Sequence, residues 1–232
     1  MLLLHKKYGH GRKERTGMAL IFPKSLDRYV RIGAGVAAVG LLGALALGGY
    51  LAQPRVIETG YQPQQPVPYS HKLHAGNLGM DCFYCHNTVY KAAWAAVPAT
   101  ETCMNCHVKV KTQSPNLLRV RESYATGEPI PWVKVHNLPD YVYFNHQAHV
   151  TAGVSCVSCH GRVDQMTEVK QVQPLNMGWC LECHRNPAPN LRPVEYVTKL
   201  DWTPDRDPAV IGREIIAAKH INPPTNCSGC HR

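Results

Sequence analysis

The pattern of hydrophobic and polar positions changes sharply twice before residue 70. Residues 32–51 are twenty consecutive positions without a charged side chain, flanked by Arg31 and Arg55. A helix rises about 1.5 Å per residue, so this stretch spans roughly 30 Å, the thickness of a bilayer's hydrocarbon core. We therefore expect residues 32–51 to form a transmembrane helix.

The segment before this span distinguishes a membrane anchor from a cleaved signal peptide. Residues 1–31 carry eight Lys and Arg against two acidic residues. The apolar stretch exceeds the about 7–15 residues usual in a signal peptide, so a retained anchor is favoured. Because basic flanks stay in the cytoplasm, we expect 1–31 to be a basic cytoplasmic segment. The chain would then cross the cytoplasmic (inner) membrane once, with a periplasmic or other extracytoplasmic domain.

After the span, polar and proline-rich positions replace the apolar ones. Residues 52–68 are rich in Pro and Gln, which is typical of an extended linker. Residues 69–232 show no continuous strand pattern, and prolines interrupt most of their connections. The expected fold class is mostly α-helix and irregular coil, with one N-terminal transmembrane helix.

Start and stop signals predict two helices in this domain. The first covers residues 115–125, with Ser114 as N-cap, a proline at the first helical position and Gly127 beyond the end. The second covers residues 208–219, with Asp207 as N-cap and again a proline at the first position.

All ten cysteines lie in Cys-x-x-Cys-His sequences. In this motif two thiols one helical turn apart add across the vinyl groups of haem c, and the adjacent histidine binds the iron from the proximal side. Zinc sites and redox dithiols also use Cys-x-x-Cys pairs, but five complete motifs leave no thiol for either. Five haem c groups are therefore predicted. In chain order, motifs 1 to 5 consist of Cys82, Cys85 and His86; Cys103, Cys106 and His107; Cys156, Cys159 and His160; Cys180, Cys183 and His184; and Cys227, Cys230 and His231.

The haems change the interpretation of composition and charge. With three Phe in the whole chain, haem must supply most of the buried apolar area, which predicts a haem-dominated core. The net charge of +9 is concentrated in residues 1–31, and haem propionates would make the external domain acidic. Without an Arg/Lys–aromatic stripe, the charge does not indicate nucleic-acid binding.

An aromatic-x-His-x-x-His sequence occurs twice, each time before a pair of motifs. It begins at Tyr69 and again at Phe144, so residues 69–111 and 144–186 are two copies of a two-haem module, followed by a fifth haem site at 227–231. A low-spin haem needs a second axial ligand, usually His or Met. We expect the first histidine of each pair to serve the next haem and the second a more distant one. The four predicted distal ligands are His71, His74, His146 and His149.

The fifth haem has no such pair before its motif. Met177 is the favoured sixth ligand and His136 the second choice, with Met166 and His220 as further candidates. A thioether ligand would raise the potential of that haem above the potentials of bis-histidine haems.

The aromatic-x-His-x-x-His module resembles small trihaem and class III multihaem cytochromes. More narrowly, residues 135–150 (VHNLPDYVYFNHQAHV) and 176–185 (NMGWCLECHR), with one anchor and five motifs, resemble the pentahaem subunit of Alternative Complex III. That resemblance implies a complex for respiratory or photosynthetic electron transfer. Its partners would be an iron–sulfur subunit and polytopic quinol-binding membrane subunits, with electrons leaving to a mono-haem cytochrome c or a soluble acceptor.

Two functions from different classes remain. The first is an electron-transfer subunit, not itself an enzyme, that relays electrons from the iron–sulfur subunit of a quinol-oxidising Alternative Complex III. The alternative is a membrane-anchored multihaem quinol dehydrogenase of the kind that feeds periplasmic nitrate or nitrite reductases. Entirely low-spin haem spectra would favour the first, and a high-spin signal would favour an open catalytic iron.

Overall fold

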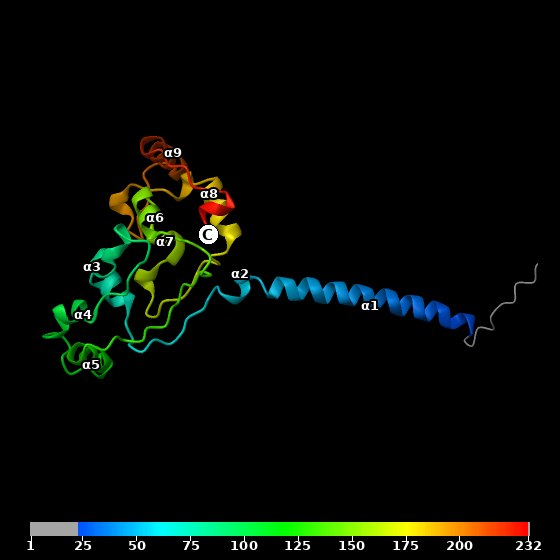
Figure 1. Cartoon of the computed structure of the whole chain (residues 1–232), viewed down its shortest axis with the longest axis horizontal. Coiled ribbons are helices and arrows are strands. Elements are labelled where there is room, and N and C mark those ends of the chain that lie inside the picture. Colours follow the sequence, from blue (N-terminus) through cyan, green and yellow to red (C-terminus); the bar gives the residue numbers. More distant parts are fainter. Residues whose placement is uncertain (1–22, 232) are drawn as a thin grey trace, which may run out of the picture. The chain divides into compact units, whose positions relative to one another are not determined.

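The computed structural model describes residues 23–231, so residues 1–22 of the predicted cytoplasmic segment lie outside the described residues. The chain divides after Tyr50 into two units, which are described separately. The first contains helix α1 (Lys24–Leu51), and the second contains the domain with all five motifs (Figure 1).

Helix α1 starts at Lys24, before the predicted apolar stretch. Asp27 and Arg31 are one turn apart on the helix and form an ion pair of 2.7 Å, the spacing at which such pairs support a helical turn. The most apolar eighteen-residue window of α1 has a mean hydropathy of 2.0. Within the described residues, α1 is the helix that is long and apolar enough to cross a membrane.

The second unit is built from short helices joined by coil, and residues 23–231 contain no strand. Two isolated antiparallel bridges join Val142 to His231 and Val154 to Leu191. The predicted fold class, mostly helix and coil, is therefore confirmed. The α-helices are α2 (Pro54–Ile57), α3 (Cys82–Cys85), α4 (Thr100–His107), α5 (Leu118–Thr126), α6 (His146–Ala152), α7 (Cys156–His160), α8 (Met177–Arg185) and α9 (Pro208–Lys219). The π-helix is η1 (Lys72–Asn77), and the 3₁₀ turns are η2 (Asn87–Tyr90), η3 (Pro115–Leu117), η4 (Val163–Gln165), η5 (Ala188–Asn190), η6 (Val194–Tyr196) and η7 (Cys227–Gly229).

Both predicted helices form with the predicted residue at the N-cap position, but only one of these side chains makes a capping hydrogen bond. In α9, the carboxylate of Asp207 accepts a hydrogen bond of 2.8 Å from the Ala209 backbone nitrogen. The helix predicted at 115–125 consists of η3 followed by α5, and Gly127 ends it with φ +78°. Ser114 stands at the N-cap position of η3 as predicted, but its side chain makes no capping hydrogen bond. The Ser114 carbonyl instead accepts from the Arg121 guanidinium at 3.0 Å.

The segment expected to be an extended linker, residues 52–68, is held on the domain at two places. Gln171 donates its backbone N–H to the carbonyl of Tyr61 at 3.0 Å and accepts from Gly60 at 2.7 Å. The side-chain amide of Gln65 makes two hydrogen bonds of 2.9 Å with the backbone of Val133. These contacts fix the path of the chain from Gly60 onward.

The core that protein side chains form is small. One buried cluster contains Val67, Met104 and Val120, and a second contains Val89, Val150 and Val197. Both clusters consist mainly of aliphatic side chains of modest size, and each lies beside a cysteine of a motif, Cys103 in the first and Cys156 in the second.

Candidate haem-binding sites

Each Cys-x-x-Cys pair lies on a single helical turn. Positions three residues apart share one face of a helix, so both thiols of a pair point the same way. Side-chain caps start three of these helices: Asp81 accepts from Phe83 N at 2.9 Å, Ser155 from Val157 N at 3.4 Å, and Asn176 from Trp179 N at 2.9 Å. Motif 2 ends helix α4, and motif 5 forms the turn η7.

Four of the five motif histidines present their rings in the same way. In each, Nδ1 lies at hydrogen-bond distance from a backbone carbonyl, so Nδ1 carries the proton and Nε2 keeps its lone pair. This is the tautomer of a metal-ligating imidazole. The pairs are His86 with Ala96 O at 3.1 Å, His107 with Val110 O at 2.9 Å, His184 with Pro224 O at 2.7 Å, and His231 with Tyr141 O at 3.3 Å.

The remaining motif histidine, His160 of motif 3, has a different neighbour. Its Nδ1 lies 3.4 Å from Nε2 of His136, and the two rings meet edge to face with centroids 4.3 Å apart. Nothing in the sequence indicates this contact of His136, because two residues 24 positions apart leave no local pattern.

The repeated aromatic-x-His-x-x-His sequence produces repeated geometry. Tyr69 stacks on His74 with centroids 4.4 Å apart and meets His71 edge-on at 4.8 Å. In the second copy, Phe144 stacks on His149 at 4.5 Å and meets His146 edge-on at 4.7 Å. One aromatic ring therefore orients both histidines of each pair.

Three of these four predicted distal ligands also direct Nδ1 to a backbone carbonyl. The pairs are His74 with Ser70 O at 2.9 Å, His146 with Ala93 O at 2.9 Å, and His149 with Asn145 O at 2.7 Å. His71 differs, since its Nδ1 is buried without a hydrogen-bond partner.

The distances between rings suit an iron atom between two imidazoles. Each Fe–N bond is about 2 Å and each ring centre lies about 1 Å behind its nitrogen, so the centroids should lie about 6 Å apart. The structure has three such pairs: His74 with His107 at 6.3 Å, His149 with His184 at 6.0 Å, and His146 with His160 at 6.4 Å. The protein thus brings imidazoles together in pairs, as haem requires. No group of three or more His, Cys, Asp or Glu within residues 23–231 converges on a common point.

Burial keeps the most enclosed of these histidines neutral. It lowers the pKa of His71 to about 4, helped by the nearby His86 and His74. It lowers the pKa of His160 to about 3, with His136 as the next contribution. Burial also lowers the pKa of His149. A neutral imidazole is the form that binds a metal ion.

The candidates for the sixth ligand of motif 5 are less clearly placed. His136 contacts the ring of His160, so the structure brings it to motif 3 rather than to motif 5. Met177 begins α8 with 66% of its surface exposed, and His220 ends α9 in an exposed left-handed conformation. The ring nearest to that of His231 belongs to Tyr141, with centroids 5.6 Å apart.

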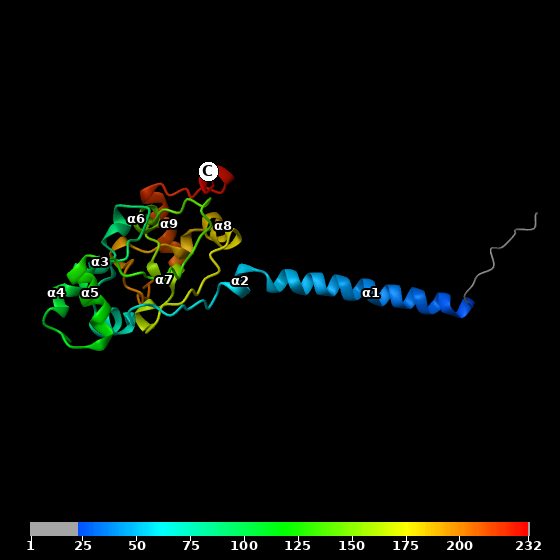
Figure 2. The same cartoon turned by 60° about the horizontal axis from the view of Figure 1, so that its bottom comes forward.

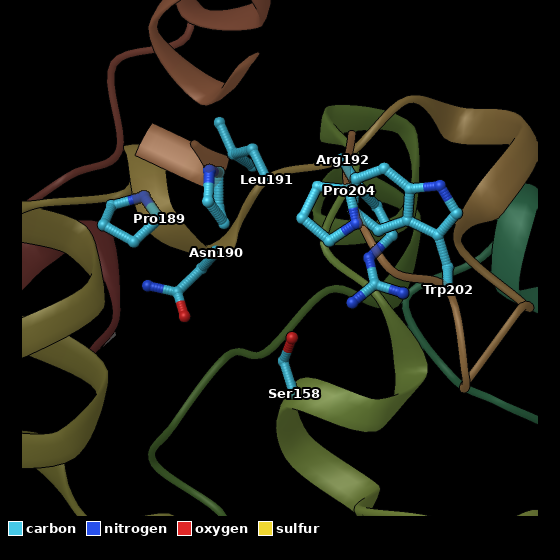
Figure 3. A pocket seen from close by; sticks show the side chains of 8 residues that line it. Ser158, Pro189, Asn190, Leu191, Arg192, Trp202 and Pro204 are labelled. Carbon is cyan, nitrogen blue, oxygen red and sulfur yellow. The ribbon is translucent and has the colours of Figure 1, made fainter. Parts of the chain in front are cut away.

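A small cavity beside motif 3 is not a haem site. It has a volume of about 130 Å³, below the range of about 300–1,000 Å³ usual for ligand pockets. Ser158 of motif 3 faces Asn190 across it, and the Arg192 guanidinium lies over the Trp202 ring at 4.9 Å (Figure 3).

Comparison with known proteins yields two matches. Residues 142–232 match the family model described as cytochrome c7 and related cytochrome c. Over 170 residues, the chain is 33% identical to the menaquinone reductase, multiheme cytochrome c subunit, of Nitratidesulfovibrio vulgaris. That similarity covers 72% of this chain and 73% of the relative.

Proposed function

The chain belongs to the family of multihaem c-type cytochromes that includes this relative, and we propose that it is a membrane-anchored pentahaem electron-transfer subunit of a quinone-linked complex. The observation that carries the proposal is the set of histidine pairs with ring centroids 6.0–6.4 Å apart. When bound, haem c supplies one-electron exchange at its iron.

The residues have distinct roles in this proposal. The ten motif cysteines attach the haems, and the five motif histidines are the proximal ligands. His74 pairs with His107, His149 with His184, and His146 with His160, as their ring distances support. His71 remains for His86, which contributes most after burial to lowering the pKa of His71. For the fifth haem we retain Met177, because His136 is already in contact with His160.

Contacts within the protein hold these ligands in place. Carbonyl acceptors on Nδ1 keep Nε2 available, and the rings of Tyr69 and Phe144 restrict how the distal histidines turn. If each haem iron takes two of these side chains as ligands, no coordination position would remain for a substrate. This is the requirement of an electron carrier rather than of a reductase.

Two kinds of complex fit this role. The sequence runs at residues 135–150 and 176–185 support Alternative Complex III, with an iron–sulfur subunit and polytopic quinol-binding subunits as partners. The identity to a menaquinone reductase subunit supports a complex in which electrons run toward the quinone. In both, this chain would be the periplasmic relay and α1 its anchor.

The test is purification of the intact chain from its native membrane in mild detergent. We expect five haem c per chain by pyridine haemochrome assay, low-spin spectra, and co-purifying iron–sulfur and polytopic membrane proteins. Reduction of the haems by added quinol would support Alternative Complex III, whereas quinone reduction by a reduced soluble cytochrome would support the other direction. A high-spin haem that binds nitrite would contradict the relay and favour an enzyme.

A further inference from the structure

We propose that the five haem sites form one unbranched row in the order motif 2, motif 1, motif 3, motif 4, motif 5. This order differs from the order in the chain, and it makes motifs 2 and 5 the two ends where partners exchange electrons. The inference rests on the proposed function, because it requires that each motif holds a haem.

Motifs 2 and 1 are in direct contact. The residue between the cysteines of motif 2, Asn105, donates its side-chain amide to the hydroxyl of Tyr84 at 3.1 Å, and Tyr84 lies between the cysteines of motif 1.

Motif 1 meets motif 3 through the loop after η6. The thiol of Cys82 lies 4.0 Å from the carbonyl of Thr198, and the backbone nitrogen of Cys156 lies 3.4 Å from the carbonyl of Val197. Asp81, which caps motif 1, accepts from the Thr198 hydroxyl at 2.9 Å. The first cysteines of motifs 1 and 3 are thus neighbours although 74 positions separate them.

Motifs 3 and 4 share helix α6. His146 on this helix lies 6.4 Å from His160 of motif 3, and His149 lies 6.0 Å from His184 of motif 4. Since the two histidines are three positions apart, one helical turn separates the two sites.

Motif 4 continues to motif 5. The Nδ1 of His184 is 2.7 Å from the carbonyl of Pro224, just before motif 5, and Pro224 closely approaches Gly229 within that motif. Both views place α4 and α3 on one side of the domain, α7 in the middle, and α8 with the C-terminal end on the other side (Figures 1 and 2).

Exposure of the thiols supports the assignment of the ends. All ten motif cysteines are among the described residues, and the two that are exposed are Cys106 and Cys227. They belong to motifs 2 and 5. The cysteines of the three inner motifs are all partly buried, so a partner protein reaches the row most closely at its two ends.

The experiment places a spin label beside the contact between motifs 1 and 3, which are neighbours in the proposed row but not in the order of the chain. Haem occupies the native thiols, so a cysteine introduced by Lys199→Cys takes a nitroxide label specifically; Lys199 is exposed and follows the Thr198 that contacts motif 1. Paramagnetic relaxation of this label is measured in the full pentahaem protein. It is then measured in variants that lack the haem of motif 1 (Cys82→Ala with Cys85→Ala) or of motif 2 (Cys103→Ala with Cys106→Ala).

The row predicts that loss of the motif 1 haem slows the relaxation of the label, whereas loss of the motif 2 haem leaves it unchanged. A second pair of variants, His71→Ala and His74→Ala, keeps all haems attached and makes one iron high-spin. His71→Ala should speed the relaxation of the label at position 199. His74→Ala should leave that label unchanged and should speed the relaxation of a control label introduced by Lys109→Cys.

One contrary outcome is that the labelled parent protein holds five haems per chain while neither Cys82→Ala with Cys85→Ala nor His71→Ala changes the relaxation of the label at position 199. This result would overturn the row and leave the proposed function intact. A haem count below five on the labelled parent would instead refute the proposed function. The haem count therefore separates the two failures.

Discussion

His136 and His160 meet edge to face, with ring planes at 83° and Nε2 of His136 3.4 Å from Nδ1 of His160. The other four motif histidines direct Nδ1 to backbone carbonyls. An acceptor on Nδ1 raises the basicity of the ligand nitrogen, so we expect His136, whose Nε2 lies within reach of that position, to tune motif 3. Unlike a backbone carbonyl, it can be removed by mutation.

Replacing His136 with Ala should raise the potential of one haem. A lost hydrogen bond of about 1 kcal/mol corresponds to roughly 40 mV for a one-electron couple, since 59 mV is a tenfold change. The measurement is an optical redox titration of the purified protein. Asn137→Ala, at the exposed position next to His136, is the matched control and should leave every potential in place. An identical titration curve for both variants would show that His136 does not act on motif 3.

Replacing His149 with Ala should leave five haems attached and make one of them high-spin. The ring of His149 lies 6.0 Å from that of His184, and the cysteines that hold the haem are untouched. Electron paramagnetic resonance detects the high-spin iron, and the haemochrome assay counts the haems. Gln147→Ala, at an exposed position of α6, should keep all irons low-spin. If His149→Ala is low-spin throughout, the assignment of His149 is incorrect.

Replacing Met177 with His should lower one haem potential by clearly more than the shift expected for His136→Ala. Imidazole stabilises ferric iron better than a thioether does, so the bis-histidine form has the lower potential. Redox titration again measures the haem potential. A second readout is the loss of any absorption band that arises from the bond between the haem iron and the thioether of Met177. An unchanged titration would remove Met177 as a ligand and leave Met166 and His220 to be tested.

Replacing Phe144 with Ala should lower the free energy of unfolding by about 1–3 kcal/mol, because the ring packs against two histidines at once. Thermal unfolding of the haem-loaded protein measures the change. Phe144→Tyr is the control and should retain stability, since Tyr69 occupies the equivalent place in the first module with nearly the same geometry. Equal loss in both variants would indicate that stacking is not what Phe144 contributes.

The sequence predicted best what depends on local spacing. Motif cysteines three positions apart share one helical face, and the aromatic-x-His-x-x-His pattern places one ring between two imidazoles; the repeated geometry around Tyr69 and Phe144 follows from it. Asp207 caps α9 as predicted, because a capping carboxylate reaches only the next turn. In each case the partners lie within a few residues of one another.

Contacts between distant coil segments were not predictable in this way. Gln171 holds Tyr61, Thr198 contacts Cys82, and His136 contacts His160. No periodicity marks any of these residues, because each contact depends on how irregular loops pass one another. Ser114 shows the same limit at short range, since Arg121 engages its carbonyl and its hydroxyl does not cap the helix.

The contact of Cys82 with the loop that also holds Cys156 has a consequence for how the two modules are related. The copies meet head to head, first site against first site, instead of following one another as a tandem array would. The turn at Gly127, in the chain between them, takes part in neither of these contacts. Insertions at that turn would lengthen the polypeptide without lengthening the path between the outermost irons, so this is where we expect related chains to differ most in length.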